Sequence, residues 1–343
     1  MKAIVYTRTG GPEVLETVER ELPNPGPGEV RVRIVVSGVN PTDWKARAGS
    51  GVGGRALPRP QVPNQDGAGV VDAVGDDVTA LSPGDRVWVW DAAWQRADGT
   101  AQEQVVLPEA QVVALPAAAS FDVGASLGIP ALTAHRTLTA REGGPARLAP
   151  GALAGTTVLV AGGAGAVGHA AIQLAKWAGA TVITTISSAA KAQLVRAAGV
   201  DHVVNYREQD VVAAVRELAP DGVQIVVEVN PAANVALDTR LLAPGGTVAI
   251  YADDGSTDDV AVPIRPNMMT NARFQFVLTY TTTPEQKRDA VEAVAAAVAD
   301  GALPVGADAG LPLTRFPLSE TAAAHAAVEA GTVGKVLVDV TEA

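Results

Sequence analysis

Six residues in the middle of the chain, Gly163-Ala164-Gly165-Ala166-Val167-Gly168, have the spacing G-x-G-x-x-G. The apolar segment Thr156–Gly163 leads into them and a segment of helical period follows, so we expect a turn between a strand and a helix. In such a turn the first glycine allows a tight bend, the second lets the backbone approach a pyrophosphate, and the third lets the helix pack closely on the sheet. The helix N-terminus adds unpaired N–H groups and the positive end of a dipole. The spacing therefore predicts a dinucleotide site, with an empty tight turn as the alternative.

The segment after this turn indicates which dinucleotide is bound. Proteins that bind NAD place an Asp or Glu about 20 residues after the glycines, where it binds the ribose 2′-OH. No Asp or Glu occurs between Gly143 and Val200. A 2′-phosphate would meet no carboxylate there, which favours NADP over NAD. The side chains expected to receive this phosphate are Ser187, Ser188, Lys191 and Tyr206. In the alternative interpretation, Lys191 is a solvated helix residue and Tyr206 an aromatic residue at the sheet edge.

The elements around the glycine turn alternate between apolar strands and helices from about residue 126. Strands are expected at Thr156–Gly163, Thr181–Ile186 and Phe274–Tyr280, with several more between the last two. Alternation of this kind is typical of a parallel sheet covered by helices on both faces. The sequence thus predicts an α/β Rossmann domain, a doubly wound parallel sheet, over residues 127–284.

The two ends of the chain predict a second, β-rich domain. Val30, Val32, Ile34 and Val36 alternate with other residues, the pattern of a half-buried strand, and short strands separated by turns continue to about residue 125. A helix is expected at Glu285–Asp300, and the closing segment GKVLVDV is a strand that the parallel sheet does not need. We therefore assign residues 1–126 and 285–343 to the second domain.

The composition narrows the possible functions. The chain has 343 residues, a net charge of −11 and no basic run, which disfavours a nucleic-acid partner. It contains no cysteine, so disulfides, thiolate zinc sites and a cysteine nucleophile are excluded. Its four histidines lack metal-ligand spacing, and we expect no metal site. No apolar run is long enough to span a membrane and no signal peptide is evident, so a cytoplasmic location is expected.

Several further motifs are spread over nearly the whole chain. The first half contains GGPEVL, SGVNPTDWKARAG, NQDGAGVVDAVG, PGDRVW and GIPALTAHRTL. The second half contains NYRE, LLAPGGTVAIYA and GTVGKVLV. Together these motifs resemble the zinc-free NADPH:quinone oxidoreductases, the zeta-crystallin-like group of the medium-chain dehydrogenase/reductase superfamily. The resemblance implies that the β-rich domain is chaperonin-10-like, that NADPH is the cofactor, that the acceptor is a quinone, and that the protein is a homodimer or homotetramer.

The resemblance also assigns residues to the site. Asn40, Asp43 and Lys45 fall on the segment that lines the substrate cleft in this family, although relatives often have Tyr where Lys45 stands, and Thr133 matches a residue beside the nicotinamide. Zinc-using relatives have Cys at the position of Asn40 and a His-Glu pair at Gln65-Asp66. Further residues match segments that line the cofactor: Asn234, Tyr251, Ala252, Val277, Leu278 and Thr279. The same comparison places Asp253 and Asp254 where relatives have neutral or basic residues, and carboxylates there would repel phosphate.

A quinone accepts hydride without a Lewis acid, so the expected mechanism depends mainly on docking the nicotinamide against the acceptor. Asn40, Lys45 or Thr133 would then stabilise charge on the acceptor oxygen. Turn and helix-cap chemistry is the alternative role for Asn40 and Asp43. Two other functions stay open: reduction of activated C=C bonds on the same scaffold, and a non-catalytic NADPH-binding structural or RNA-binding protein.

Overall fold

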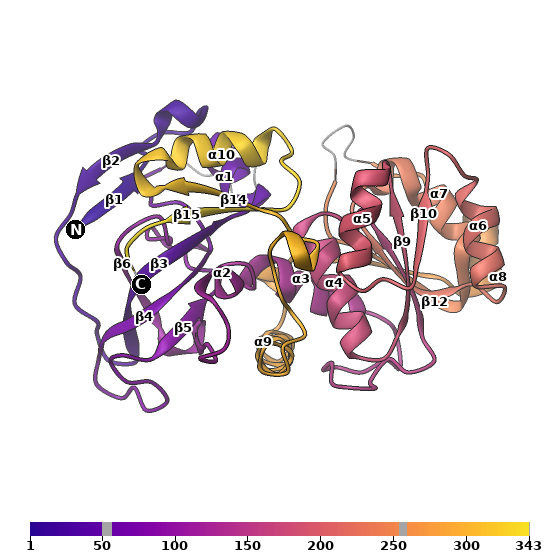
Figure 1. Ribbon diagram of the computed structural model, residues 1–343, viewed down its shortest axis with the longest axis horizontal. Helices are drawn as coiled ribbons and strands as arrows, with labels where there is room; N and C mark the ends of the chain where they lie inside the picture. The colour runs from indigo at the N-terminus through magenta and orange to yellow at the C-terminus, as the bar shows by residue number, and fades with distance from the viewer. Residues whose placement is uncertain (50–56, 254–258, 343) are drawn as a thin grey trace. The chain divides into compact units, whose positions relative to one another are not determined.

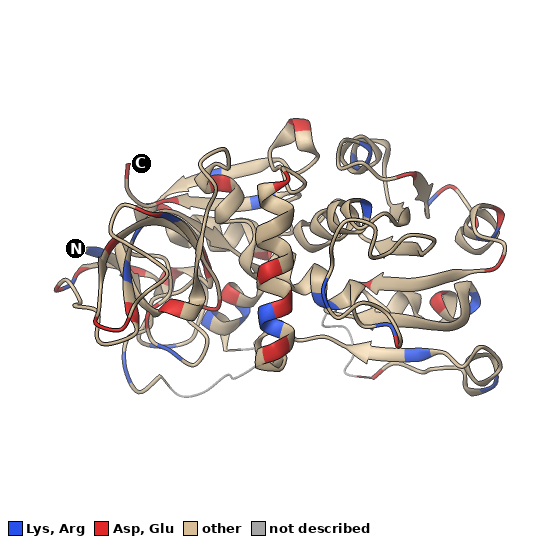
Figure 2. Cartoon of the chain, turned by 90° about the horizontal axis from the view of Figure 1, so that it is seen from below, with Lys and Arg blue, Asp and Glu red and all other residues tan. Residues whose placement is uncertain are grey.

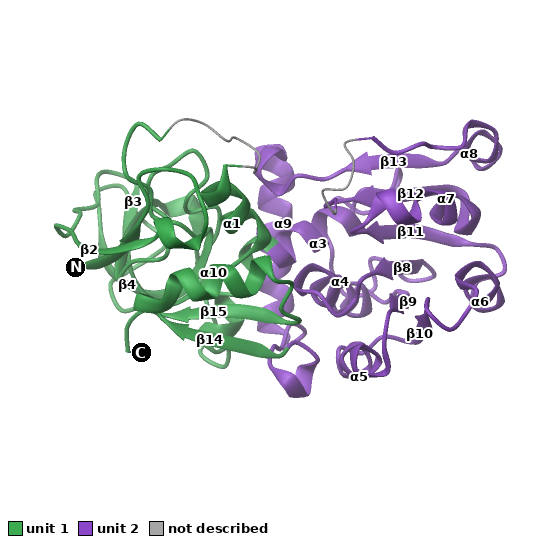
Figure 3. Cartoon of the chain, turned by 90° about the horizontal axis from the view of Figure 1, so that it is seen from above, with its two compact units in different colours: residues 1–129, 312–343 green, residues 130–311 purple. Residues whose placement is uncertain are grey.

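The computed structural model describes residues 1–49, 57–253 and 259–342, which form two compact units. Unit 1 comprises Met1–Ile129 and Pro312–Ala343, and unit 2 comprises Pro130–Leu311 (Figure 3). A β-rich unit made from both ends of the chain and a central parallel α/β unit are the architecture expected from the sequence, which is thereby confirmed. Every helix in the described ranges is too short or too polar to span a bilayer.

The second boundary between the units lies later than residue 285. Helix α9 (Pro284–Ala299) and the segment after it belong to unit 2 because helix α4 (Ala166–Trp177) binds them there. The Trp177 indole N–H donates to the Asp300 carboxylate at 2.9 Å, and the Gln173 amide donates to the Pro304 carbonyl at 3.0 Å. These tertiary contacts have no signature in the local sequence.

Unit 2 contains a six-stranded sheet (Figure 1) whose strand order is β10-β9-β8-β11-β12-β13 (Figure 3), and every neighbouring pair is parallel. Its strands are β8 (Thr157–Ala161), β9 (Thr181–Ile186), β10 (His202–Asn205), β11 (Val223–Glu228), β12 (Leu242–Ile250) and β13 (Arg273–Phe276). Besides α4 and α9, its helices are α5 (Ala189–Ala197), α6 (Val211–Leu218), α7 (Pro231–Leu241), α8 (Ile264–Thr270) and the short η3 (Thr279–Thr281) and η4 (Ala307–Ala309). The chain order reverses between β8 and β11, and a doubly wound sheet binds its ligand at the carboxyl ends of the strands at such a point.

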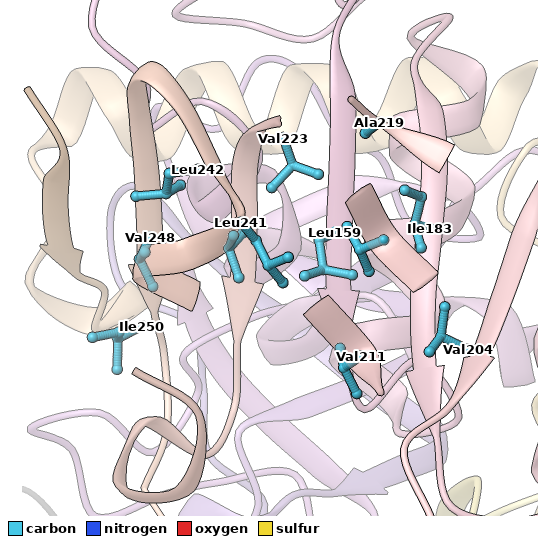
Figure 4. Packing of buried hydrophobic residues seen from close by; sticks show 12 residues of the cluster. Leu159, Ile183, Val204, Val211, Ala219, Val223, Leu241, Leu242, Val248 and Ile250 are labelled. Carbon is cyan, nitrogen blue, oxygen red and sulfur yellow. The ribbon is translucent and has the colours of Figure 1, made fainter. Parts of the chain in front are cut away.

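The alternation of side chains in these strands creates two apolar faces. On one face the strands contribute Leu159, Ile183 and Val248, which pack with Val215 of α6 and Leu241 of α7 (Figure 4). Residues of opposite parity, such as Val158 and Val160, are also fully buried. A sheet buried on both sides explains why these strands are apolar without interruption.

Unit 1 is built on a larger, mostly antiparallel sheet in the order β14-β15-β3-β4-β5-β7, with β6 also paired to β3 and a separate pair β1-β2. Its strands are β1 (Lys2–Val5), β2 (Glu16–Glu19), β3 (Glu29–Val39), β4 (Asp66–Val74), β5 (Arg86–Val89), β6 (Gln104–Pro108), β7 (Val112–Ala114), β14 (Leu313–Pro317) and β15 (Lys335–Asp339). Its helices are α1 (Pro41–Ala48), α2 (Phe121–Gly124), α10 (Thr321–Glu329) and the short η1 (Pro12–Val14), η2 (Glu109–Gln111) and η5 (Leu318–Glu320). Helix α3 (Gly128–Leu138) runs from unit 1 into unit 2.

The closing strand β15 pairs with β3, so the prediction that the end of the chain rejoins the N-terminal domain is confirmed. Val336 lies opposite Val39, and Asp66 lies opposite Gly38 on the other side of β3. This register brings the end of β3 and the starts of β4 and β15 to one place in unit 1.

Candidate functional site

The residues expected to bind the cofactor follow the carboxyl ends of the strands of unit 2. The glycine segment follows β8, Ser187 and Ser188 follow β9, and Tyr206 follows β10. Tyr251 and Val277 directly follow β12 and β13. Because all six strands are parallel, these strand ends meet at one edge of the sheet, where doubly wound folds bind their ligands.

The glycine loop has the geometry that a bound pyrophosphate requires. Helix α4 begins at Ala166 with Gly165 as its N-cap residue. A Cβ on Gly165 would meet only the Gly162 carbonyl, at 3.5 Å, so the space in front of it is open. A Cβ on Gly168 would lie 2.4 Å from that carbonyl, which shows that this glycine permits close packing of helix and loop. The N-terminus of α4 can therefore receive an anion.

One glycine was assigned the wrong role from the sequence. The residue with the left-handed conformation is Gly162, at φ +68°, and not Gly163. Gly163 is required for packing instead, because a Cβ there would lie 2.3 Å from the hydroxyl oxygen of Thr184 and 2.9 Å from Ile172. The tight bend thus begins one residue before the G-x-G-x-x-G segment.

The expected phosphate pocket lies between the ends of β9 and β10. The Tyr206 N–H donates to the Ile186 carbonyl at 3.1 Å, which joins these two strand ends. The Ser188 hydroxyl caps α5 by accepting from the Lys191 N–H at 3.3 Å. Ser187 and Lys191 are half-buried, while the Tyr206 side chain is exposed. The described structure therefore brings all four residues together beside a strand end that carries no carboxylate.

The remaining predicted cofactor residues differ in how deeply their side chains are buried. Val277 and Thr279 are buried, and Thr279 accepts a hydrogen bond from the Lys287 ammonium at 3.2 Å. Leu278, Tyr251 and Ala252 are half-buried. Asp253 is exposed, and Asp254 lies outside the described residues.

A pair of buried acids at this edge was missed in the sequence. Asn234 donates to the Glu228 carboxylate at 3.0 Å, and the Asn230 N–H donates to the same oxygen. Burial raises the pKa of Glu228. Burial and the charge of Glu228 raise the pKa of Asp238 well above its usual range. The signal available in the sequence was Glu228, a single acid at the end of the apolar strand β11. Its proximity to Asp238 on α7 is evident only in the folded structure.

In unit 1, Asn40 and Asp43 join into one buried cluster. Asn40 is the N-cap residue of α1, and its N–H donates to Asp43 Oδ2 at 2.7 Å, so Asp43 has the helix-cap role that was the alternative to a role in the cleft. The Asn40 side chain is 2% exposed, and its amide donates to Asp66 Oδ2 at 2.7 Å. Its carbonyl oxygen accepts from the Lys335 ammonium, also at 2.7 Å. Asn40 therefore makes its polar contacts inside the protein.

Lys335 and Asp66 belong to the same cluster, and neither was among the site residues expected from the sequence. Both are at most 2% exposed, and Lys335 Nζ lies 3.6 Å from Asp66 Oδ2. Burial raises the pKa of Asp43 to about 7, with a smaller contribution from the charge of Asp66. Burial also raises the pKa of Asp66 to about 6, against the opposing charge of Lys335. The sequence signal that could have identified them is a charged residue at the start of an apolar strand: Asp66 in DGAGVV and Lys335 in KVLV.

Lys45 and Thr133, the other residues expected to act on the acceptor, lie on helices α1 and α3. Lys45 is half-buried on α1 in unit 1. Thr133 is buried on α3 and belongs to unit 2.

The donor atoms in this cluster do not fit a zinc ion. Zinc is bound by Cys, His, Asp or Glu, and of Asn40, Gln65 and Asp66 only Asp66 is such a ligand. Its Oδ1 accepts from the Ile129 N–H at 2.9 Å, and the nearby Lys335 ammonium would repel a dication. The Gln65 carbonyl oxygen accepts from the Ala93 N–H at 2.9 Å. Among the described residues, no group of three His, Cys, Asp or Glu side chains is arranged to hold a metal.

Two families of known proteins match the chain. The family described as "Alcohol dehydrogenase GroES-like domain" matches residues 26–117, and that described as "Zinc-binding dehydrogenase" matches residues 166–299. The human quinone oxidoreductase is 30% identical over 342 residues, covering 98% of this chain and 97% of that protein. The rat synaptic vesicle membrane protein VAT-1 homolog is 34% identical over 275 residues, which cover 80% of this chain. The match spans only 63% of that longer protein.

Solved structures show the same fold. An Escherichia coli quinone oxidoreductase complexed with NADPH has a TM-score of 0.79 and 26% identity, covering 99% of this chain and 100% of that one. An NAD-dependent alcohol dehydrogenase has a TM-score of 0.84 and 31% identity, with the same coverage of 99% and 100%. Structural relatives of this chain therefore include proteins that bind either nicotinamide dinucleotide.

Proposed function

Because this chain belongs to the quinone oxidoreductase family of the medium-chain dehydrogenase/reductase superfamily, we propose that it reduces quinones with NADPH. The observation that carries the proposal is the open glycine loop at the carboxyl edge of the sheet, next to a strand end without a carboxylate. When bound, the dihydronicotinamide supplies the reducing equivalents. The chain's own residues bind the pyrophosphate at the N-terminus of α4 and the ribose phosphate between β9 and β10.

The preference for NADPH over NADH is part of the proposal. Ser187, Lys191 and Tyr206 offer hydroxyl and ammonium groups to a 2′-phosphate, and the end of β9 carries no acid. The exposed Glu208 follows Tyr206 by two residues at the end of β10. Replacing Lys191 by Ala should lower the ratio of kcat/KM for NADPH to that for NADH about 10- to 150-fold, since a charge-assisted hydrogen bond contributes about 1.5–3 kcal/mol. Arg196 is exposed in the last turn of the same helix, so Arg196→Ala is the matched control and should leave the ratio unchanged. A wild-type protein that prefers NADH would contradict the assignment.

We also propose that the reaction needs no zinc. Asn40 and Gln65 stand where zinc-using relatives have ligands, and the Lys335 ammonium lies beside Asp66. A quinone is electrophilic enough to accept hydride when it is held against the nicotinamide, and positioning alone supplies much of the lowering of the barrier. Dialysis against a strong chelator should leave quinone reduction unchanged. Loss of activity that zinc restores would contradict this part of the proposal.

Reduction of activated C=C bonds is the alternative on the same scaffold. Relative rates with 1,4-benzoquinone and an enone, followed by the loss of NADPH absorbance, distinguish the two acceptors. A faster rate with the enone would replace the quinone assignment.

A non-catalytic role in RNA binding is disfavoured by the charge distribution. The net charge is −11, and basic residues are interspersed with acidic ones along the described chain (Figure 2). Tight NADPH binding without turnover of any acceptor would revive this role. The expected cytoplasmic location stays a prediction.

We further propose that the partner of this chain is a second copy of itself, bound at β13 and α8. Ile264 and Met269 on α8 are each 76% exposed, and Phe276 on β13 is 65% exposed. In the described structure β13 is an edge strand, and an exposed apolar edge invites pairing with another strand. A two-fold axis would let β13 pair with its own copy and extend the sheet. Met269→Glu should reduce the mass measured by light scattering to that of a monomer. Leu218→Glu, which alters an exposed apolar residue on α6 outside this surface, is the control and should leave the mass unchanged. An unchanged mass in Met269→Glu would refute this interface.

A further inference from the structure

The ammonium of Lys335 is held inside unit 1 by side chains from two other segments. Nζ lies 2.7 Å from Asn40 Oδ1 and 3.6 Å from Asp66 Oδ2, and the side chain is 2% exposed. Asn40 in turn donates to Asp66, so the three groups form a closed triangle. A buried charge without such partners would be strongly unfavourable.

The sheet register explains why these residues meet. Asp66 begins β4 and Lys335 begins β15, and both strands pair with β3, whose last residue, Val39, precedes Asn40. The triangle is therefore fixed by three neighbouring strands and not by flexible loops. A site supported by sheet strands holds its side chains precisely.

The charges of the cluster balance near neutral pH. Asp43, Asp66 and Lys335 are all buried, and Asp91 also acts on Asp66 through its charge. Asp43 Oδ1 is buried and has no hydrogen-bond partner in the described structure, so it offers a place for a proton. With that proton on Asp43, the ionised Asp66 and Lys335 neutralise each other. Burial of Asp43, Asp66 and Lys335 favours this state because the three side chains together then carry no net charge.

We propose that Lys335 is a positioning residue whose ammonium is a built-in cation, holding the Asn40 amide and the Asp66 carboxylate where zinc-using relatives have metal-binding residues. The proposal rests on the proposed function for its kinetic consequences. Lys335 acts through Asn40 and Asp66, whose side chains its ammonium holds in place.

The test compares three variants with the wild type. Lys335→Met removes the charge and keeps an unbranched side chain. Lys335→Met/Asp66→Asn removes both opposite charges and avoids an unpaired buried carboxylate. Arg315→Met is the matched control, because it removes a cation from the neighbouring strand β14, where Arg315 pairs with Asp122 and Asp339 near the surface.

In Lys335→Met we expect kcat/KM for quinone to fall about 10- to 100-fold, the loss typical of removing a group that orients a site's ligands. The acidic limb of its pH profile should move to higher pH, because the pKa of Asp66 rises once the ammonium is gone. The double variant should recover part of the loss, which shows coupling between the two charges. Arg315→Met should match the wild type.

A second measurement needs no substrate and separates this inference from the proposed function. The pKa of Asp66 in the fold lies above its ordinary value, so stability falls as pH rises through that pKa. In Lys335→Met the fall should extend to higher pH, and the thermal midpoint between pH 6 and pH 8 should drop more than in the wild type. Unchanged pH profiles of both activity and unfolding in Lys335→Met, or a double variant as impaired as the single one, would overturn the proposal.

Discussion

Replacing Asp43 by Asn should remove a pH-dependent loss of stability. Burial raises the pKa of Asp43 from 3.8 to about 7, and the side chain is 3% exposed. The folded state therefore binds a proton that the unfolded state has released between these two pH values, and stability declines as pH rises through that range. At about 1.36 kcal/mol per pH unit, the full change corresponds to about 4 kcal/mol. The asparagine introduced by Asp43→Asn carries no ionisable group, and its carbonyl oxygen can still accept from the Asn40 N–H.

The assay is chemical or thermal unfolding of the wild type and Asp43→Asn at a series of pH values from 4 to 8.5. The free energy of unfolding of the variant, relative to the wild type, should rise by about 4 kcal/mol over this range. The two proteins should differ least at the acidic end, where Asp43 is protonated in the fold. Glu13→Gln, which alters an exposed acid, controls for the general effect of removing a carboxylate. Parallel pH curves for the wild type and Asp43→Asn would refute the assignment of a buried, protonated Asp43.

Two other predictions concern unit 2. Gly168→Ala should lower both NADPH affinity and stability, because its Cβ would lie 2.4 Å from the Gly162 carbonyl. Gly165→Ala should lower NADPH affinity alone, since its Cβ faces open space that the phosphate would occupy. Calorimetric titration measures the affinity and thermal unfolding the stability; equal NADPH affinity in the wild type and both variants would contradict the loop assignment. Asp238→Asn should make the free energy of unfolding less dependent on pH above the ordinary pKa range of carboxyl groups, because the raised pKa values of Asp238 and Glu228 make the wild type lose stability as pH rises. The measurement is the thermal midpoint over a series of pH values, and an unchanged slope would argue against a raised pKa of Asp238.

The sequence alone was sufficient to predict the parallel sheet of unit 2 and the helices between its strands. Helical and strand periods are local properties, and a G-x-G-x-x-G segment between a strand and a helix is a local motif. The absence of acids between Gly143 and Val200 can also be read directly from the printed residues. Parallel strands place their carboxyl ends together, so the order of elements predicted which segments share an edge. The exchange of roles between Gly162 and Gly163 was not predictable, because it depends on contacts with Thr184 and Ile172 on neighbouring elements.

Tertiary structure decided the cluster in unit 1 and the boundary between the units. Lys335 and Asn40 are separated by 295 positions, and only the pairing of β15 with β3 brings them together. Glu228 on β11 and Asp238 on α7 likewise owe their raised pKa values mainly to burial in the folded unit. Desolvation and the distance between charges determine these properties, and both quantities arise when the chain folds, so no local pattern of residue types contains them.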